Sequence, residues 1–330
     1  QESETIARRT TQGAAPAWKE AADALGSDKR FAKIQLNPIA GLLPLGADPV
    51  SELQEFALLP TGSAPTRNEA GALQLDHASA IILVLVPGGT FWLGASKDPN
   101  SPQVDPNALD AEGPPVEVQL TPFFVAKHET SQAQWMHVMR SNPSSIPAGL
   151  KVRTNQIDER HPITGASWSD ALDFAARTGT TLPTEAQWEF AARAMTTTPF
   201  WTGQNPESID GALNCCDQTV IDAGLKVQLY EADIKDGWIQ TAPIGMFRPN
   251  AFGLHDTMGN VSEWTMDNWC DYAAPTRPGD GLRSSDNPNR CARGGHWASH
   301  RLSLRSASRS IVDPNARDVV YGFRVVKTVP

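Results

Sequence analysis

Basic residues and long apolar runs are both scarce in this 330-residue chain. It contains 28 Lys and Arg against 37 Asp and Glu, a formal net charge of −9. This balance argues against nucleic-acid and anionic-membrane binding, because both need a basic face that displaces counterions. The longest apolar run, residues 80–89 ("AIILVLVPGG"), is too short to cross a bilayer and predicts a buried strand. Residues 1–13 lack the apolar h-region of a signal peptide, so none is predicted and the compartment stays open.

Cysteine is also scarce, and its placement excludes some chemistry. The chain has Cys215, Cys216, Cys270 and Cys291, with no CxxC motif or His/Cys cluster that would indicate zinc. The adjacent pair 215/216 is poorly placed to bond to itself. Cys270 and Cys291 bracket a polar loop rich in Pro and Gly. They can join across that loop or remain two free buried thiols.

Local signals predict an irregular α+β protein with little regular secondary structure. Capping boxes, in which a Ser or Thr caps the first turn and a residue three positions on reciprocates, predict three helices. They follow Ser131 (with Gln134), Ser167 (with Asp170) and Thr184 (with Gln187). Gly179 suits a left-handed stop after the second helix. Residues 1–79 are expected to form a helical and loop lead-in, packed on or linking to a main domain at residues 80–330.

Seven stretches carry a family resemblance when taken in order. They are "VPGGTFWLGAS" (86–96), "EGPPVEVQLTPFFVAKHETSQAQW" (112–135), "HPITGASWSDALDFAARTGTTLPTEAQWEFAARA" (161–194), "NAFGLHDTMGNVSEWTMDNW" (250–269), "RGGHW" (293–297), "LRSASR" (304–309) and "GFRVVK" (322–327). Together they resemble the formylglycine-generating enzyme (sulfatase-modifying factor) domain family. The resemblance implies a C-type-lectin-like fold, often with bound calcium. Residues 44–62 resemble a lead-in seen where such domains follow other modules, including bacterial Ser/Thr kinases.

The resemblance also implies calcium sites. Calcium prefers six to eight oxygen ligands, from carboxylates and from carbonyls exposed at sharp turns. The first implied site uses the side chains of Asp256 and Glu263 with the carbonyls of Gly259 and Val261. The second uses the side chains of Asn214 and Asp236 with the carbonyls of Cys215 and Trp238. The other interpretation is that these acids cap turns or face solvent. We expect two structural calcium ions.

The copper ligands of the family's enzyme are missing. That enzyme oxidises a substrate cysteine to formylglycine with oxygen and a copper ion held by two thiolates, and a soft cuprous ion selects sulfur. Counting from Gly294, the first of these cysteines falls on Ser299. The second falls near Ser303 or Leu304, or in a three-residue gap. No cysteine follows Cys291, which lies before the Gly-Gly turn. We therefore expect no copper and no catalytic residues of this type, although enzymatic activity of another kind stays open.

Other chemistry-bearing residues have structural interpretations. His296 and His300 are four apart, but no predicted helix or third ligand accompanies them, so they are interpreted as surface histidines. Spacing predicts that Glu185, Glu189 and Arg193 form i,i+4 pairs on one helix face, worth a few tenths of a kcal/mol each, as structural scaffold. No GxSxG nucleophile elbow is present. The three arginines of the C-terminal core either brace acids such as Asp256 and Glu263, which we favour, or line a groove for an anion; they are Arg305, Arg309 and Arg324.

The segment after the Gly-Gly turn is the candidate ligand surface. Its framework positions are Gly294, Gly295, Trp297, Leu304, Arg305, Ser306, Arg309, Pro314, Arg317, Gly322, Phe323 and Arg324. Alternating with them are positions of mixed character, which are His296, Ala298, Ser299, His300, Ser303, Ser310, Ile311, Val312, Asp313, Ala316, Asp318, Val319, Val320 and Tyr321. Apolar residues beside His and Tyr suit recognition. The spacing resembles the variable proteins of diversity-generating retroelements.

These observations predict a non-catalytic binding protein. A calcium-stabilised, lectin-like scaffold would present the mixed positions to an unknown protein or small-molecule ligand. Two alternatives remain. One is an oxidoreductase of the formylglycine-generating type with altered chemistry. The other is a regulatory domain of a larger signalling protein such as a Ser/Thr kinase.

Overall fold

A five-stranded antiparallel sheet forms one half of the molecule in the computed structural model, which describes residues 2–31 and 34–330. Its order is β1-β2-β5-β8-β15, and the strands are β1 (Leu42–Ala47), β2 (Gln54–Leu58), β5 (Ile81–Val86), β8 (Phe123–Ala126) and β15 (Val326–Thr328). Every residue of β5 is buried, which confirms the strand predicted from the apolar run. Because β2 pairs with β5, residues on both sides of the predicted boundary at residue 80 share one sheet.

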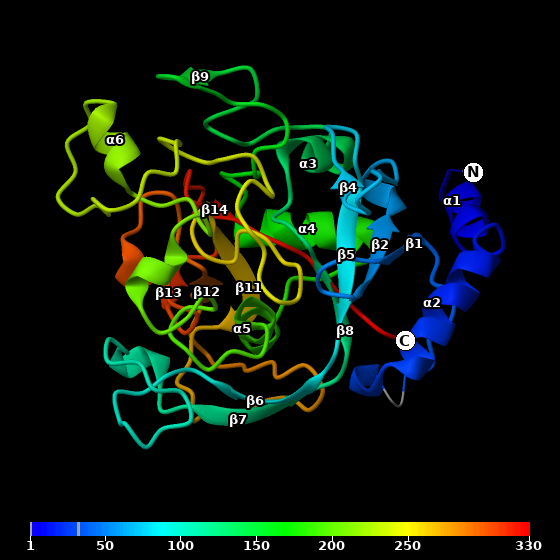
Figure 1. Ribbon diagram of the computed structural model, residues 1–330, viewed down its shortest axis with the longest axis horizontal. Helices are drawn as coiled ribbons and strands as arrows, with labels where there is room; N and C mark the ends of the chain where they lie inside the picture. Colours follow the sequence, from blue (N-terminus) through cyan, green and yellow to red (C-terminus); the bar gives the residue numbers. More distant parts are fainter. Residues whose placement is uncertain (1, 32–33) are drawn as a thin grey trace.

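The N-terminal helices pack against this sheet. They are α1 (Glu2–Thr10) and α2 (Ala15–Ser27), followed by the single turn η1 (Lys29–Phe31). Trp18 of α2 is buried, and its ring lies 5.4 Å from that of Phe56 in β2. Figure 1 shows α1 and α2 on the opposite side of the sheet from α4. The first part of the lead-in is therefore helical, with one face of α2 buried, whereas residues 42–58 contribute strands β1 and β2 to the sheet.

A four-stranded sheet of order β13-β12-β11-β14 carries the C-terminal half. Its strands are β11 (Ser262–Asn268), β12 (Arg290–Arg293), β13 (Arg309–Val312) and β14 (Tyr321–Gly322). Only the β11–β14 pairing is parallel. Short two-stranded ribbons complete the strands, namely β3 (Thr66–Arg67) with β4 (Leu73–Gln74), β6 (Gly89–Leu93) with β7 (Val116–Leu120), and β9 (Lys151–Val152) with β10 (Asn155–Gln156).

The three helices predicted from capping boxes are confirmed. They are α3 (Gln132–Met139), α4 (Trp168–Thr178) and α5 (Glu185–Arg193), and each has its Ser or Thr cap with the reciprocal bond in place. Gly179 ends α4 with φ 68°, the left-handed stop expected there. Other helical turns are α6 (Gln218–Asp222), η2 (Leu59–Thr61), η3 (Asp110–Glu112), η4 (Pro206–Ile209) and η5 (Arg301–Ser303). In the described residues no helix is long and apolar enough to cross a membrane.

The predicted i,i+4 pairs of α5 lie in the core rather than on a solvated face. All residues from Glu185 to Arg193 are buried. The Glu189–Arg193 pair forms at 2.8 Å, but Glu185 binds arginines from other parts of the chain. The scaffold role of this helix is therefore confirmed. The predicted few tenths of a kcal/mol per pair holds only for solvated ions, and these ions lie in the core.

All four cysteines are buried and free, so the two-thiol alternative holds for Cys270 and Cys291 in this structure.

Candidate functional site

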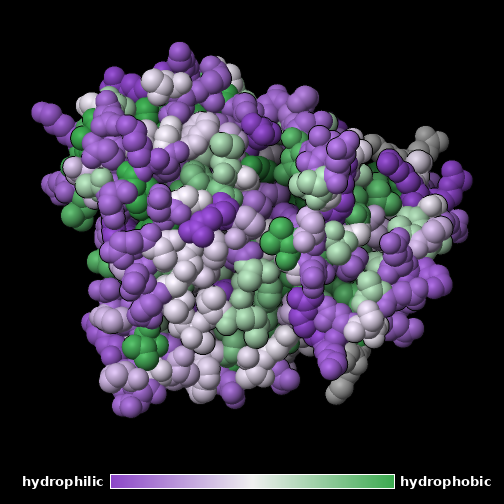
Figure 2. Space-filling model, in the orientation of Figure 1, coloured by the Kyte–Doolittle hydropathy of each residue, from purple (hydrophilic) through white to green (hydrophobic). Residues whose placement is uncertain are grey.

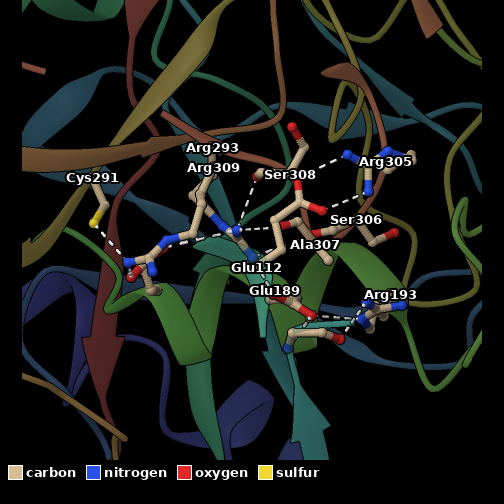
Figure 3. A network of polar contacts seen from close by, with 12 residues as sticks. Glu112, Glu189, Arg193, Cys291, Arg293, Arg305, Ser306, Ala307, Ser308 and Arg309 are labelled. Atoms are coloured by element: carbon tan, nitrogen blue, oxygen red, sulfur yellow. Dashed lines mark hydrogen bonds and ion pairs between the residues drawn. The ribbon is translucent and has the colours of Figure 1, made fainter. Parts of the chain in front are cut away.

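Buried ion pairs lie directly beneath the C-terminal segment (Figure 3). Arg309 donates to both carboxylate oxygens of Glu185, at 2.9 and 2.5 Å, and to the Sγ of Cys291 at 3.2 Å. Arg293 pairs with Glu189 and donates to the carbonyls of residues 306–308. The C-terminal segment is thereby fixed to α5 by charged hydrogen bonds in a region that water does not reach.

Two further arginines complete this frame. Arg305 donates to Asp105 at 2.7 Å and to both oxygens of Glu112 at 2.7 and 2.8 Å. Arg324 donates to both oxygens of Glu263, at 2.6 and 2.7 Å. The bracing interpretation is confirmed for all three C-terminal arginines, but Arg305 and Arg309 brace acids other than Asp256 and Glu263, the two named as examples. Each guanidinium is engaged inside the protein, so none lines an anion groove.

The framework and mixed positions differ in burial. Eight framework residues are buried, namely Gly294, Leu304, Arg305, Ser306, Arg309, Gly322, Phe323 and Arg324. Of the mixed positions, all but Ser299 and Val312 are exposed or half-buried. The Gly-Gly turn that opens the segment is tightly packed: a Cβ on Gly295, where φ is +67°, would lie 2.7 Å from Leu304 and 2.8 Å from a carbonyl oxygen.

The residues at the start of the segment bind one another. Ser299, at the place of the first enzyme cysteine, is buried, and its Oγ accepts from the backbone N–H of His296 at 3.1 Å. Nδ1 of His296 accepts from the N–H of Ala298 at 3.2 Å, and burial lowers the pKa of His296 to about 4. His296 and His300 are both half-buried rather than fully on the surface. No three His, Cys, Asp or Glu side chains in the described chain are arranged to hold a metal ion.

The first implied calcium site is a buried cluster of acids around Arg324. Asp256 and Glu263 lie there with Glu129, whose carboxylate accepts from Asn260 Nδ2 at 2.6 Å and from the N–H of Val261 at 3.1 Å. Burial raises the pKa of Asp256 to about 6. Burial and the charges of Asp256 and Glu263 raise the pKa of Glu129 well above its usual range. Sequence reasoning missed Glu129, which lies more than a hundred residues away in the chain.

The second implied site adjoins the first. Asn214 and Gly259 form a β-bridge, and the backbone N–H of Asn260 donates to the carbonyl of Asn214 at 2.9 Å. Asp236 accepts from the N–H groups of Cys215, at 2.9 Å, and Trp238, at 2.7 Å. Burial, with the neighbouring charge of Asp217, raises the pKa of Asp236 to about 7.

Each implied calcium site has one buried oxygen without a donor. In the described chain, Oδ1 of Asp256 and Oδ1 of Asn214 have no hydrogen-bond partner. An unpaired buried oxygen costs free energy unless a cation, water or donor reaches it. Glu263 fits less simply, because Arg324 and Trp188 already donate to its oxygens. Asp236 at the second site likewise already accepts from two backbone N–H groups. Each implied site thus combines one unpaired buried oxygen with a carboxylate that already accepts hydrogen bonds.

Three surface depressions lie away from the candidate ligand surface. They have volumes of about 690, 630 and 780 Å³ and are lined by residues around α3 and the N-terminal lead-in, including His77, His137 and Arg140. None of the mixed positions lines them.

This arrangement is the irregular α+β, C-type-lectin-like fold of the formylglycine-generating-enzyme type. The structure is similar to that of PvdO from Pseudomonas aeruginosa, with a TM-score of 0.60, 26% identity and coverage of 76% of this chain and 95% of that one. It is also similar in fold to Treponema denticola variable protein 1, with a TM-score of 0.60, 18% identity and coverage of 76% and 96%.

A comparison of the sequence with known protein families identifies the family of this chain. The model of the sulfatase-modifying factor enzyme 1-like domain matches residues 71–329, and the chain belongs to this family. It is 27% identical to the formylglycine-generating enzyme of Thermomonospora curvata over 296 residues, which cover 73% of this chain and 92% of the relative. It is 27% identical over 274 residues to the serine/threonine-protein kinase pkn1 of Chlamydia caviae, covering 75% of this chain and 38% of the kinase.

Proposed function

We propose that this domain is a ligand-binding module that presents the mixed positions of its C-terminal segment on a frame held by buried ion pairs. The observation that carries the proposal is the contrast in burial within that segment. Framework residues such as Arg305 and Arg309 are locked to distant acids, whereas side chains such as Ile311, which is 49% exposed, face solvent. A rigid frame under an exposed, chemically mixed surface lowers the entropic cost of binding.

Population sequencing tests the recognition role directly. The codons for residues 296–321 are to be read across the population from which the chain comes. Substitutions confined to the mixed positions, with the framework unchanged, are expected for a diversified receptor. A uniform sequence would contradict diversification and would indicate one fixed partner.

Surface and framework substitutions are expected to differ in their effect on stability. Ile311→Ser changes an exposed side chain and should alter the free energy of unfolding by no more than about 0.5 kcal/mol. Leu304→Ala opens a cavity in a cluster with Phe200 and Met258 and should cost about 2–5 kcal/mol. Urea unfolding followed by Trp fluorescence measures both. Equal losses would show that the exposed positions are part of the frame.

We also propose that two calcium ions stiffen this frame. The support is the pair of buried oxygens without donors and the charge of the first site. There, three carboxylates surround one guanidinium, so a divalent cation would balance the fully ionised cluster. A calcium ion would accept these oxygens as ligands and so remove the cost of leaving them unpaired.

Calcium titration of chelator-treated protein is expected to show two bound ions. Asp256→Asn and Asp236→Asn should each remove one ion, because each variant weakens a different site. Asp313→Asn, at an exposed mixed position, is the matched control and should leave the stoichiometry at two. Calorimetric titration and a calcium-dependent rise in Tm provide the measurements. A wild-type protein that binds no calcium would rule out both sites.

Regulation within a larger signalling protein is the second candidate function. Its support is the similarity to the kinase pkn1, in which the region that matches this chain makes up only 38% of the kinase. An enzyme with altered chemistry has less support, because Ser299 stands where the first copper ligand of the family's enzyme is expected.

A further inference from the structure

One side of α3 faces a surface depression rather than another element of the fold. Ala133, Met136, His137 and the C-cap residue Arg140 follow the spacing i, i+3, i+4 and i+7, which is typical of one side of a helix. Met136 is 41% exposed, His137 and Arg140 are exposed, and Ala133 is half-buried. All four residues line the depression of about 630 Å³.

That depression adjoins the two others. It shares Ala148 and Glu159 with the depression of about 690 Å³, and His137 and Arg140 with that of about 780 Å³. The three therefore form one groove, the α3 groove, which runs from residues 156–160 along α3 to the end of α4. Figure 1 shows α3 between the loop that carries β9 and the five-stranded sheet.

Side chains of α3 hold both walls of the groove. The Gln132 amide oxygen accepts from Asn142 Nδ2 and from the N–H of Ala148, each at 2.9 Å, and so fixes one wall. Gln134 donates to the carbonyl of Ser79 at 3.2 Å and fixes the other. Walls that are already ordered lower the entropic cost of binding.

Unpaired charges of opposite sign lie at the two ends of α3. The carbonyl of Glu159 accepts from the N–H of Ala133 at 2.9 Å, which places Glu159 beside the first turn. Arg140 caps the last turn. Both side chains are exposed, and neither forms an ion pair with another described residue. Seven helical rises separate positions 133 and 140, a distance of about 10 Å.

We propose that the α3 groove binds an extended segment of a partner protein, with an acidic side chain at Arg140 and a basic side chain at Glu159. An extended chain advances about 3.3 Å per residue, so the two charges of the partner stand about three positions apart. An apolar side chain between them would cover Met136, whose flexible thioether adapts to varied apolar partners. None of the mixed positions lines the groove, so the inference does not depend on the C-terminal ligand surface.

Other occupants fit these observations less well. Single-stranded nucleic acid needs a basic channel and aromatic platforms, but the chain has a net charge of −9 and no Trp, Tyr or Phe lines the groove. A single small molecule is usually enclosed in one pocket, whereas this groove is open and extends through three depressions. Figure 2 shows hydrophobic residues scattered among hydrophilic ones on the drawn face, unlike a surface that enters lipid.

Selection of phage-displayed random twelve-residue peptides on the full chain tests the proposal. Enriched peptides are expected to carry an acidic and a basic residue about three positions apart. Arg140→Glu should weaken binding of a synthetic enriched peptide about tenfold or more, measured by calorimetric titration. Replacing the acid of the peptide with Lys should restore binding to this variant and weaken binding to the wild type. Lys226→Glu makes the same change of charge at an exposed residue outside the groove and is the matched control.

Glu159→Lys tests the other end of the groove independently, and serves in place of Arg140→Glu if that variant lowers Tm. It should weaken the same peptide and be rescued when the basic residue of the peptide becomes Glu. The absence of enriched peptides would overturn the proposal, as would equal weakening by Arg140→Glu and Lys226→Glu. Binding that is lost in Ile311→Asp but retained in both groove variants would place the peptide on the C-terminal surface, which overturns this inference and supports the proposed function.

Discussion

Replacing Arg324 with Met is expected to lower the free energy of unfolding by about 3–5 kcal/mol. Arg324 is 1% exposed and donates to both oxygens of Glu263 and to the carbonyls of His255 and Asp256. The Met side chain fills most of the space but removes the cation that pairs with Glu263 and lies beside the carboxylates of Glu129 and Asp256. Removing one partner of a buried pair is costly because the remaining charges stay buried. Urea unfolding in calcium-free buffer measures the loss.

Arg317→Met is the matched control for this prediction. Arg317 also pairs with an acid, Asp170, at 2.5 Å, but the two side chains are 55% and 29% exposed. A solvated pair contributes no more than about 1 kcal/mol. Adding Glu263→Gln to Arg324→Met removes one unpaired charge and should recover part of the stability. If Arg324→Met were no more destabilising than Arg317→Met, the buried cluster would not hold the fold as described.

Local signals explain what could be predicted from the sequence. Capping boxes involve residues three positions apart, so Ser131, Ser167 and Thr184 indicate helix starts without knowledge of the fold. The fully buried strand at residues 81–86 follows equally from a continuous apolar run. These signals, with the ordered family motifs, were sufficient to predict an α+β fold of the formylglycine-generating-enzyme type.

The partners of the buried charges could not be predicted, for a physical reason. A charged residue is normally solvated, so its sequence pattern suggests a surface. In α5 that expectation failed, because Glu185 and Glu189 are neutralised by arginines more than a hundred residues away. Arg305 and Asp105 are two hundred positions apart, and nothing local links them. The roles of the arginines as braces could be anticipated from the family framework, but the identities of their partners required the fold.

The same reasoning applies to the candidate site. The proposed calcium ligands were inferred from one short motif and two local strings that match the family, and the structure brings the two groups together through the bridge between Asn214 and Gly259. Glu129 was missed because a lone acid between His128 and Thr130 carries no signal of its own. Its position next to Asp256 arises only when the β8–α3 connection packs against the turn that precedes β11.

Glu185→Gln is expected to destabilise the protein by about 3–5 kcal/mol at neutral pH. Glu185 is fully buried and binds Arg309 at 2.5 and 2.9 Å and Arg283 at 2.7 Å. The neutral amide keeps the shape but leaves buried Arg309 without its carboxylate partner and Arg283 with only Asp267, at 4.0 Å. Asp173→Asn is the control, because its i,i+4 pair with Arg177 is about half exposed on both sides and should contribute only about 0.3–0.5 kcal/mol.

The pH dependence of stability separates the charge of Glu185 from its shape. Burial alone would raise its pKa, but Arg309, Arg283 and Arg293 outweigh burial and lower the pKa to about 2, from an ordinary value of 4.5. A carboxyl whose pKa is lower in the folded state stabilises the fold above its unfolded value, and that stability is lost as pH falls. The wild type should therefore lose stability between about pH 4.5 and 2. Over the same pH range, Glu185→Gln should lose less free energy of unfolding than Asp173→Asn. Parallel curves of stability against pH for the two variants would contradict an ionised Glu185 in the folded protein.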